Sequence, residues 1–177
     1  MDTIETLMKR RSCRAYKPEP VPDEHLGTIL EAGRYAPSAG NTQPWRFVIA
    51  RNPELKDKLS EACKEQYWLA NADIILAGIG VPEESRGREG WQWYPVDVAI
   101  AMENMILAAT ALSYGTCWIG AFDQEQVKEL LDIPSDMHIV ALASIGVSDD
   151  VHEAPPRKSW AELFSGDKYG SPLSIES

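Results

Sequence analysis

The stretch DVAIAMENMILAATALSY, residues 97–114, is apolar over most of its length and constrains how the rest of the chain packs. Asp97 can cap a helix here, and the apolar residues then fall on nearly every side of that helix. A helix of this kind is buried all round, and one small domain offers little room for that. We therefore expect a subunit interface to cover part of it, and a charged residue at Ile106 to separate the subunits.

The segments on either side of this helix alternate between strand and helix patterns. Strands are expected at residues 47–50, 72–81 and 138–147, and a strand or loop at 117–122. Helices are expected at 2–11, 22–34, about a dozen residues after Asn52, from Asp123 to Leu131, and as a last turn at 160–164. Residues 82–95 are expected to form a polar and aromatic loop. The 177 residues therefore predict a single α+β domain over 1–177.

The charge balance makes two classes of partner, nucleic acids and anionic membranes, unfavourable. The chain carries 17 Lys and Arg residues against 27 Asp and Glu, a formal net charge of −10. This disfavours nucleic acids and anionic membranes, because cationic side chains supply most of the affinity for both. Cys13, Cys63 and Cys117 are odd in number and far apart, and no signal peptide is recognisable. We expect reduced thiols and a cytoplasmic protein.

Signatures of metal, dinucleotide and triad chemistry are missing. His25, His138 and His152 share no ligand spacing, and no HExxH, P-loop or GxSxG motif occurs. The sequence Gly-Ile-Gly at 78–80 follows a predicted strand, but Glu83 occupies the place of the third glycine of a dinucleotide-binding loop. Metal and triad hydrolase chemistry therefore have no support in the sequence, and we expect no metal site.

The first segment with potential chemistry is Arg10-Arg11-Ser12-Cys13-Arg14, which places three guanidiniums and a hydroxyl at a helix end. Guanidiniums suit phosphate because their planar fork donates two parallel hydrogen bonds. Taken alone, the segment could also be a solvated helix end. Three arginines within five residues are nevertheless unusual in a chain of net charge −10.

Three further segments could bind a ligand. Residues 37–45, PSAGNTQPW, offer amides, hydroxyls and exposed backbone, or form a plain turn. Residues 115–123 contain glycines that would let backbone N–H groups approach a ring, or form an ordinary strand. Arg157 and Lys158 form a second cationic pair, which by itself is an exposed pair.

In this order along the chain, five segments together resemble the nitroreductase family of FMN-dependent oxidoreductases. They are RRSCRAY at 10–16, APSAGNTQPW at 36–45, the helix from Asp97 to Ala109 with its Glu103-Asn104 pair, WIGAF at 118–122, and PRK at 156–158. They span nearly the whole chain. The resemblance implies a central, mainly antiparallel sheet flanked by helices, in an intertwined homodimer that holds FMN at its interface.

The resemblance also implies which residues bind the cofactor. The FMN phosphate and ribityl oxygens would be held by Arg10, Arg11, Ser12 and Arg14, with Arg157 and Lys158 closing on the phosphate. The partner subunit would supply Pro37, Ser38, Ala39, Asn41 and Gln43. The isoalloxazine would be lined by Trp118, Ile119 and Gly120, with the Gly120 N–H facing flavin N5, and Gln66 would approach the pyrimidine edge.

The chemistry that the resemblance implies belongs to the flavin. NADH or NADPH would give a hydride to the flavin and leave, and a small planar acceptor, a nitroaromatic or quinone, would then be reduced in a ping-pong cycle. Trp91, Trp93 and Tyr94 could stack on such a substrate or plug the core. Two alternatives stay open: a specialised dehalogenating or flavin-modifying branch, and a flavin-binding dimer without turnover.

Overall fold

The computed structural model describes residues 2–88, 90–149 and 154–174. Its body is built on a four-stranded sheet in the order β1-β2-β6-β5, in which every neighbouring pair is antiparallel. The strands are β1 (Trp45–Ala50), β2 (Ile74–Gly80), β5 (Tyr114–Ile119) and β6 (His138–Val147). The expected α+β fold with a mainly antiparallel sheet is confirmed.

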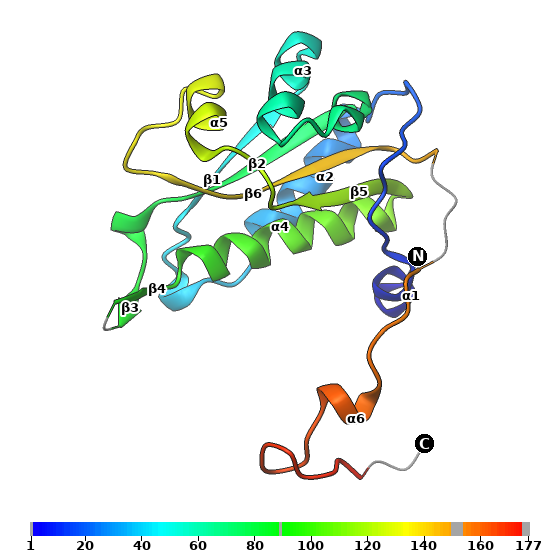
Figure 1. Ribbon diagram of the computed structural model, residues 1–177, viewed down its shortest axis with the longest axis vertical. Helices are drawn as coiled ribbons and strands as arrows, with labels where there is room; N and C mark the ends of the chain where they lie inside the picture. Colours follow the sequence, from blue (N-terminus) through cyan, green and yellow to red (C-terminus); the bar gives the residue numbers. More distant parts are fainter. Residues whose placement is uncertain (1, 89, 150–153, 175–177) are drawn as a thin grey trace.

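Helices cover both faces of this sheet (Figure 1). One face carries α2 (Asp23–Arg34) and α4 (Tyr94–Ala111), and the other carries α3 (Pro53–Ala62) and α5 (Gln124–Leu130). Successive side chains of a strand point to opposite faces, so alternate residues of β2 enter two separate cores. Ile74 and Leu76 pack toward α4, whereas Ile75 and Ala77 pack toward α3 and α5. The two cores fix the sheet between its helical layers.

The caps expected at the start of α3 and α5 are present. Asn52 Oδ1 accepts a hydrogen bond from the Leu55 N–H at 3.0 Å, and Asp123 Oδ1 accepts one from the Gln126 N–H at 3.0 Å. Each cap satisfies an otherwise unpaired N–H in the first helical turn. The other short elements are η1 (Ala39–Asn41), η2 (Tyr67–Asn71), η3 (Pro82–Glu84), β3 (Gly87–Arg88) and β4 (Trp91–Gln92).

The N-terminal part of the chain runs along the outer edge of β5. After α1 (Thr3–Lys9), the Cys13 N–H donates to the Thr116 carbonyl at 2.8 Å. Further along, the Lys17 N–H donates to the Val147 carbonyl at 2.9 Å. Helix α1 packs against α4. These bonds place the arginine-rich segment against β5.

The C-terminal residues 154–174, here called the arm, extend away from the body (Figure 1). The arm contains α6 (Trp160–Leu163), which confirms the expected last helical turn. A capping box closes its start, since Glu162 Oε2 accepts from the Ser159 N–H at 3.0 Å. The large side chains of the arm are exposed in the single chain.

Helix α4 differs from the expectation in two respects. It begins at Tyr94, with Pro95 in its first turn, so Asp97 lies inside the helix and does not cap it. Moreover, the side of α4 that is open in the single chain, as an expected subunit interface would require, does not include Ile106. Ile106 is 2% exposed and belongs to the chain's own core, whereas Ile100 is 36% exposed. The idea that a charge at Ile106 would separate subunits is therefore wrong, because such a charge would disrupt the fold of one chain.

Residues 82–95 are more ordered than a loop. They contain η3 and a short hairpin of β3 and β4, in which Gly87 pairs with Gln92. The Trp93 N–H donates to the Arg86 carbonyl at 3.0 Å, and the Tyr94 N–H donates to Ser85 Oγ at 2.9 Å. The hairpin is thus attached directly to the start of α4.

Candidate functional site

Three of the predicted phosphate-binding residues lie in one short segment beside β5. Ser12 forms a bridge with Thr116, and the Cys13 N–H donates to the Thr116 carbonyl at 2.8 Å, so this segment is held against the strand. Burial raises the pKa of the neighbouring Cys117 thiol, while Arg14, Ser12 and Arg10 act to lower it. We call Arg10, Ser12 and Arg14 the arginine cluster.

Neighbouring side chains position the members of this cluster. Arg10 Nε lies 3.9 Å from Glu103 Oε1 on α4, a partly buried carboxyl whose pKa is raised by burial. The Arg14 guanidinium lies 5.9 Å from the centre of the Trp68 ring. Arg11 has a different local role, because its Nη1 donates to the Arg10 carbonyl at 2.8 Å and to the last turn of α1.

The end of β5 presents an open surface next to the arginine cluster. Trp118 is 40% exposed, and no atom of another segment comes within 4 Å of the position of a Cβ on Gly120. Gln66 reaches the same place, where its Nε2 donates to the Cys63 carbonyl at 2.7 Å and to the Ala121 carbonyl at 3.3 Å. The Ile119 side chain is buried in the core between the sheet and helices α3 and α5. Ile119 can therefore face a ligand only through its backbone.

The predicted loop at residues 37–43 is tightly folded. Gly40, Asn41 and Gln43 all have positive φ, between 51° and 63°. Such backbone is costly for non-glycine residues and persists where surrounding bonds hold it. Here Ser38 Oγ accepts from the Gln43 N–H at 2.9 Å, and Gln43 Nε2 lies 3.3 Å from Asn41 Oδ1. Pro37, Asn41 and Gln43 are left exposed, as a ligand-binding loop requires.

Asp97 is the functional residue that sequence reasoning missed. It is 3% exposed, its Oδ1 accepts from the Ala39 N–H at 3.1 Å, and its Oδ2 is buried without a hydrogen-bond partner among the described residues. The carboxylate thereby attaches the 37–43 loop to the first turn of α4. Its sequence position signalled only a helix cap, because the loop lies 58 residues away.

We expect Asp97→Ala to release this loop and to weaken FMN binding by about tenfold, the size of one lost charge-assisted hydrogen bond. Asp97→Asn keeps an acceptor oxygen and should weaken binding less. Titration of the apoprotein with FMN, followed by flavin fluorescence, measures both. Equal affinity for FMN in Asp97→Ala and the unmodified protein would show that the loop does not depend on this carboxylate.

Within one chain, the arginine cluster and the 37–43 loop lie at different places along α4. The loop attaches to Asp97 in the first turn, and the cluster lies near Glu103 and beyond, where Ser12 pairs with Thr116 on β5. Asp97 and Glu103 are six residues apart on α4, about 9 Å along the helix axis. The two predicted halves of the site are thus attached to different turns of the helix.

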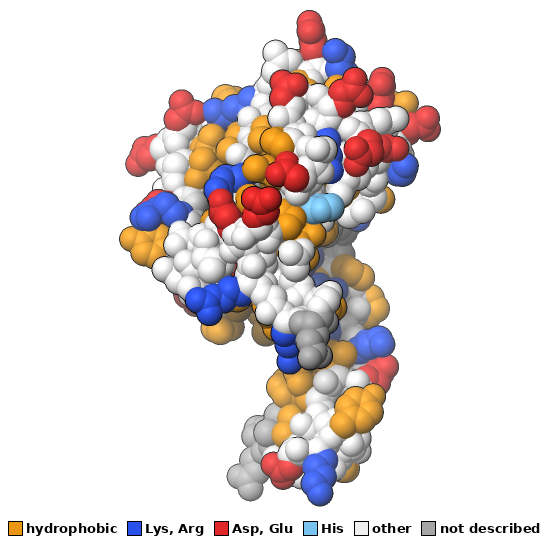
Figure 2. Space-filling model, turned by 90° about the vertical axis from the view of Figure 1, so that its left-hand side faces the viewer, with side chains coloured by type: hydrophobic (Ala, Val, Ile, Leu, Met, Phe, Trp, Pro, Cys, Tyr) orange, Lys and Arg blue, Asp and Glu red, His pale blue; other side chains and the backbone are white. Residues whose placement is uncertain are grey.

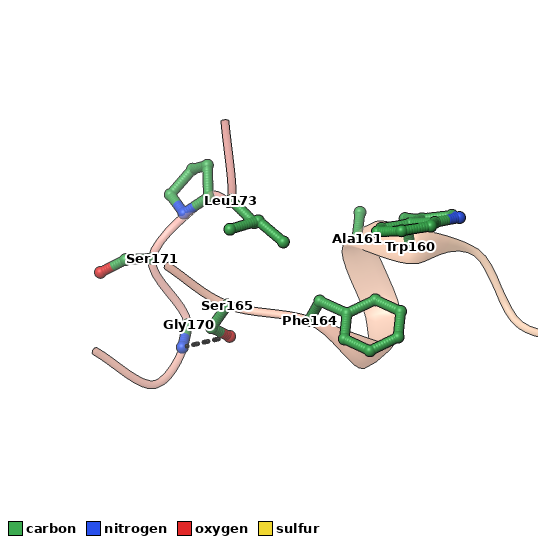
Figure 3. Close-up of a pocket in the computed structure, with 8 residues that line it drawn as sticks. Trp160, Ala161, Phe164, Ser165, Gly170, Ser171 and Leu173 are labelled. Carbon is green, nitrogen blue, oxygen red and sulfur yellow. Dashed lines mark hydrogen bonds between the residues drawn. The ribbon is translucent and has the colours of Figure 1, made fainter. Parts of the chain in front are cut away.

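Arg157 and Lys158 also stand apart from the arginine cluster. Both are exposed in the arm, and in the described part of the chain neither forms an ion pair or hydrogen bond with Arg10 or Ser12. The arm also encloses a hollow of about 710 Å³, lined mainly by apolar side chains. Figure 3 shows Trp160 of α6 and Phe164, which follows that helix, on one side of this hollow and Leu173 on the other. An apolar hollow of this kind on an exposed arm is suited to packing against protein.

The remaining titratable residues form no obvious reactive centre. Within residues 2–88, 90–149 and 154–174, no group of three His, Cys, Asp or Glu side chains is arranged to hold a metal. His25 Nδ1 lies 2.7 Å from the Tyr114 hydroxyl, and His138 stacks on Tyr94, while His152 lies outside the described residues. All three cysteines are buried free thiols, and burial raises the pKa of Cys63 to about 11. No helix in the described residues is both long and apolar enough to cross a membrane.

Comparison with known proteins agrees with this geometry. The Nitroreductase family model matches residues 7–77 and 66–147 of the chain. The chain is 33% identical over 153 residues to a protein of Archaeoglobus fulgidus, covering 84% of this chain and 87% of that protein. It is 31% identical over 173 residues to the FMN reductase [NAD(P)H] of Bacillus subtilis, covering 88% of this chain and 70% of that protein.

Solved structures give the same result. A nitroreductase family protein from Clostridium novyi NT is 32% identical and superposes with a TM-score of 0.81, covering 97% of this chain and 96% of that one. A nitroreductase family protein from Clostridium difficile 630 is 27% identical with a TM-score of 0.87. The match covers 95% of this chain and 99% of that one. The chain belongs to the nitroreductase family.

Proposed function

We propose that this chain, an FMN-dependent NAD(P)H oxidoreductase by its family, reduces nitroaromatic or quinone-like acceptors. The observation that carries the proposal is that the segment with Arg10, Ser12 and Arg14 is held against β5, next to the open end of that strand. A cationic cluster beside an exposed indole and free backbone matches the two parts of FMN, a phosphate and a flat ring. The name of the Bacillus subtilis relative, an FMN reductase [NAD(P)H], supports the same pairing of cofactors.

The residues present fit FMN by their donor chemistry. Arg10, Ser12 and Arg14 would bind its phosphate through charge-assisted hydrogen bonds. Gln66 already donates through Nε2 within the chain, which leaves its carbonyl oxygen to accept from a ring N–H. The Gly120 backbone N–H would donate to the ring, and Trp118 would cover it. When bound, FMN would supply hydride transfer between NAD(P)H and the acceptor, in two half-reactions at one place.

A homodimer would complete this site. Many of the exposed large apolar side chains lie on α1, on one side of α4 and in the arm, and such patches mark interaction surfaces. They include Ile4, Leu7, Met8, Val96, Ile100, Trp160, Leu163, Phe164 and Leu173. A second copy would cover the exposed side of α4 and bring its 37–43 loop to the arginine cluster of the first. It would also give the arm, with Arg157 and Lys158, a surface to pack on.

The decisive experiment measures turnover of the bound flavin. The protein is loaded with FMN, freed of oxygen and mixed with NADPH or NADH, and the visible flavin absorbance should disappear rapidly. A quinone added afterwards should restore it. Initial rates with both substrates varied should give parallel double-reciprocal lines, as a ping-pong cycle requires. Intersecting lines would contradict the cycle, and flavin that neither nucleotide reduces would identify a flavin-binding dimer without turnover.

A further inference from the structure

The β3–β4 hairpin and the residue before it combine two arginines, Arg86 and Arg88, with an exposed aromatic surface. Trp91 is 56% exposed and meets Trp93 edge-on, with ring centres 6.2 Å apart. The Arg88 guanidinium lies 5.9 Å from the centre of the Trp93 ring. In the described part of the chain, neither Arg86 nor Arg88 forms an ion pair.

The surrounding charge makes this pair of arginines unusual. The chain has a net charge of −10, and nearby Arg46 is already neutralised by Glu84 at 2.5 Å. Figure 2 looks onto the side of the molecule that carries the hairpin. Acidic side chains crowd the upper part of the body in this view, and Lys and Arg side chains are seen in its lower part. Unpaired guanidiniums beside an exposed indole fit a ligand that carries both phosphate and a flat base.

The hairpin is also coupled to the predicted cofactor-binding loop. The Arg86 side chain lies so close to Gly40 that a Cβ at Gly40 would overlap its guanidinium. Hydrogen bonds from Trp93 and Tyr94 fix the same hairpin to the start of α4. Wherever the 37–43 loop contributes to a flavin site, the hairpin therefore lies at the rim of that site.

We propose that the β3–β4 hairpin binds the adenosine 2′-phosphate half of NADPH, and so selects NADPH over NADH. Trp91 stacks on the adenine, and Arg88, with Arg86 behind it, pairs with the 2′-phosphate. NADH carries a hydroxyl at that place, so it gains the stacking without the charge pairing. The inference rests on the proposed function, because it names the electron donor of the same site.

The test compares the two nucleotides as donors for the FMN-loaded enzyme with one quinone as acceptor. Unmodified enzyme should favour NADPH by at least about tenfold in kcat/KM, the effect expected of one charge-assisted contact. Arg88→Gln should lower kcat/KM for NADPH by about tenfold and change that for NADH by less than about threefold. Trp91→Ala should lower both by similar factors. The matched control is Arg46→Gln, which removes a paired arginine and should leave the NADPH-to-NADH ratio unchanged.

Each other outcome has a definite meaning. An unmodified enzyme that favours NADH, or an Arg88→Gln enzyme with an unchanged ratio, would overturn the proposal. Equal losses for both nucleotides in Arg88→Gln would also overturn it, because they would indicate a structural role for Arg88. The proposed function fails in a different way: then neither nucleotide reduces the flavin in the unmodified, fully loaded protein.

Discussion

Replacing Arg14 with glutamate is expected to remove most of the FMN affinity. In the proposed site, the substitution turns a charge-assisted contact with the phosphate into a repulsion. The loss should be at least about a hundredfold in Kd, as found when one partner of a close charge pair is removed. The FMN affinity is measured in two ways: by the amount of flavin that stays bound through gel filtration, and by titration of the apoprotein with FMN.

The control for this variant is Lys58→Glu. Lys58 is exposed on α3, which lies on the sheet face opposite α4. Its replacement by glutamate changes the charge of the chain by the same amount, but at a place away from the arginine cluster. It should bind FMN normally. Full FMN occupancy in Arg14→Glu would refute the assignment of the phosphate site, whereas equal losses in both variants would point to net charge as the cause.

Ile100→Glu is expected to give a monomer that has lost its flavin. Ile100 is exposed on α4 in the single chain, so a carboxylate there is compatible with the fold of one chain. In a dimer that covers α4, the same carboxylate would be buried without a partner, which costs several kcal/mol. Analytical ultracentrifugation gives the mass, and the absorbance at the flavin band gives the FMN content of each species.

The conservative variant Ile100→Val keeps the apolar surface and should remain a flavin-loaded dimer. Circular dichroism of Ile100→Glu should show unchanged secondary structure, which separates loss of assembly from loss of folding. A monomer of Ile100→Glu that still holds FMN would refute the shared site. A stable dimer of this variant would show that the exposed side of α4 is not the interface.

Much of the fold could be predicted from the sequence because its signals are local. The continuous apolar runs of β2 and β6 and the caps at Asn52 and Asp123 need no knowledge of distant segments. The hairpin escaped prediction because its strands have two residues each, too few for any periodicity. The start of α4 was misjudged because Asp97 precedes an apolar run, whereas Pro95 at the first turn allows an earlier start.

The candidate site, too, could be predicted only where its residues are close together in the sequence. Arg10, Ser12 and Arg14 could be proposed together because they are neighbours in sequence, and the structure holds their segment against β5. The bond from Ala39 to Asp97 spans 58 residues and left no pattern to detect. Ile106 shows a further limit, since the apolar character of a helix residue does not tell whether its own chain or another one buries it.

The segment that carries the arginine cluster also completes the sheet. Ser12 pairs with Thr116, so the N-terminal residues occupy the outer edge of β5 that would otherwise offer free backbone groups. Exposed edges of this kind are templates for pairing with other chains and for aggregation. The peptide that covers this part of the edge is also the one to which we assign the cations of the proposed phosphate site. In that proposal, cofactor binding and protection of the sheet edge depend on one short stretch of chain.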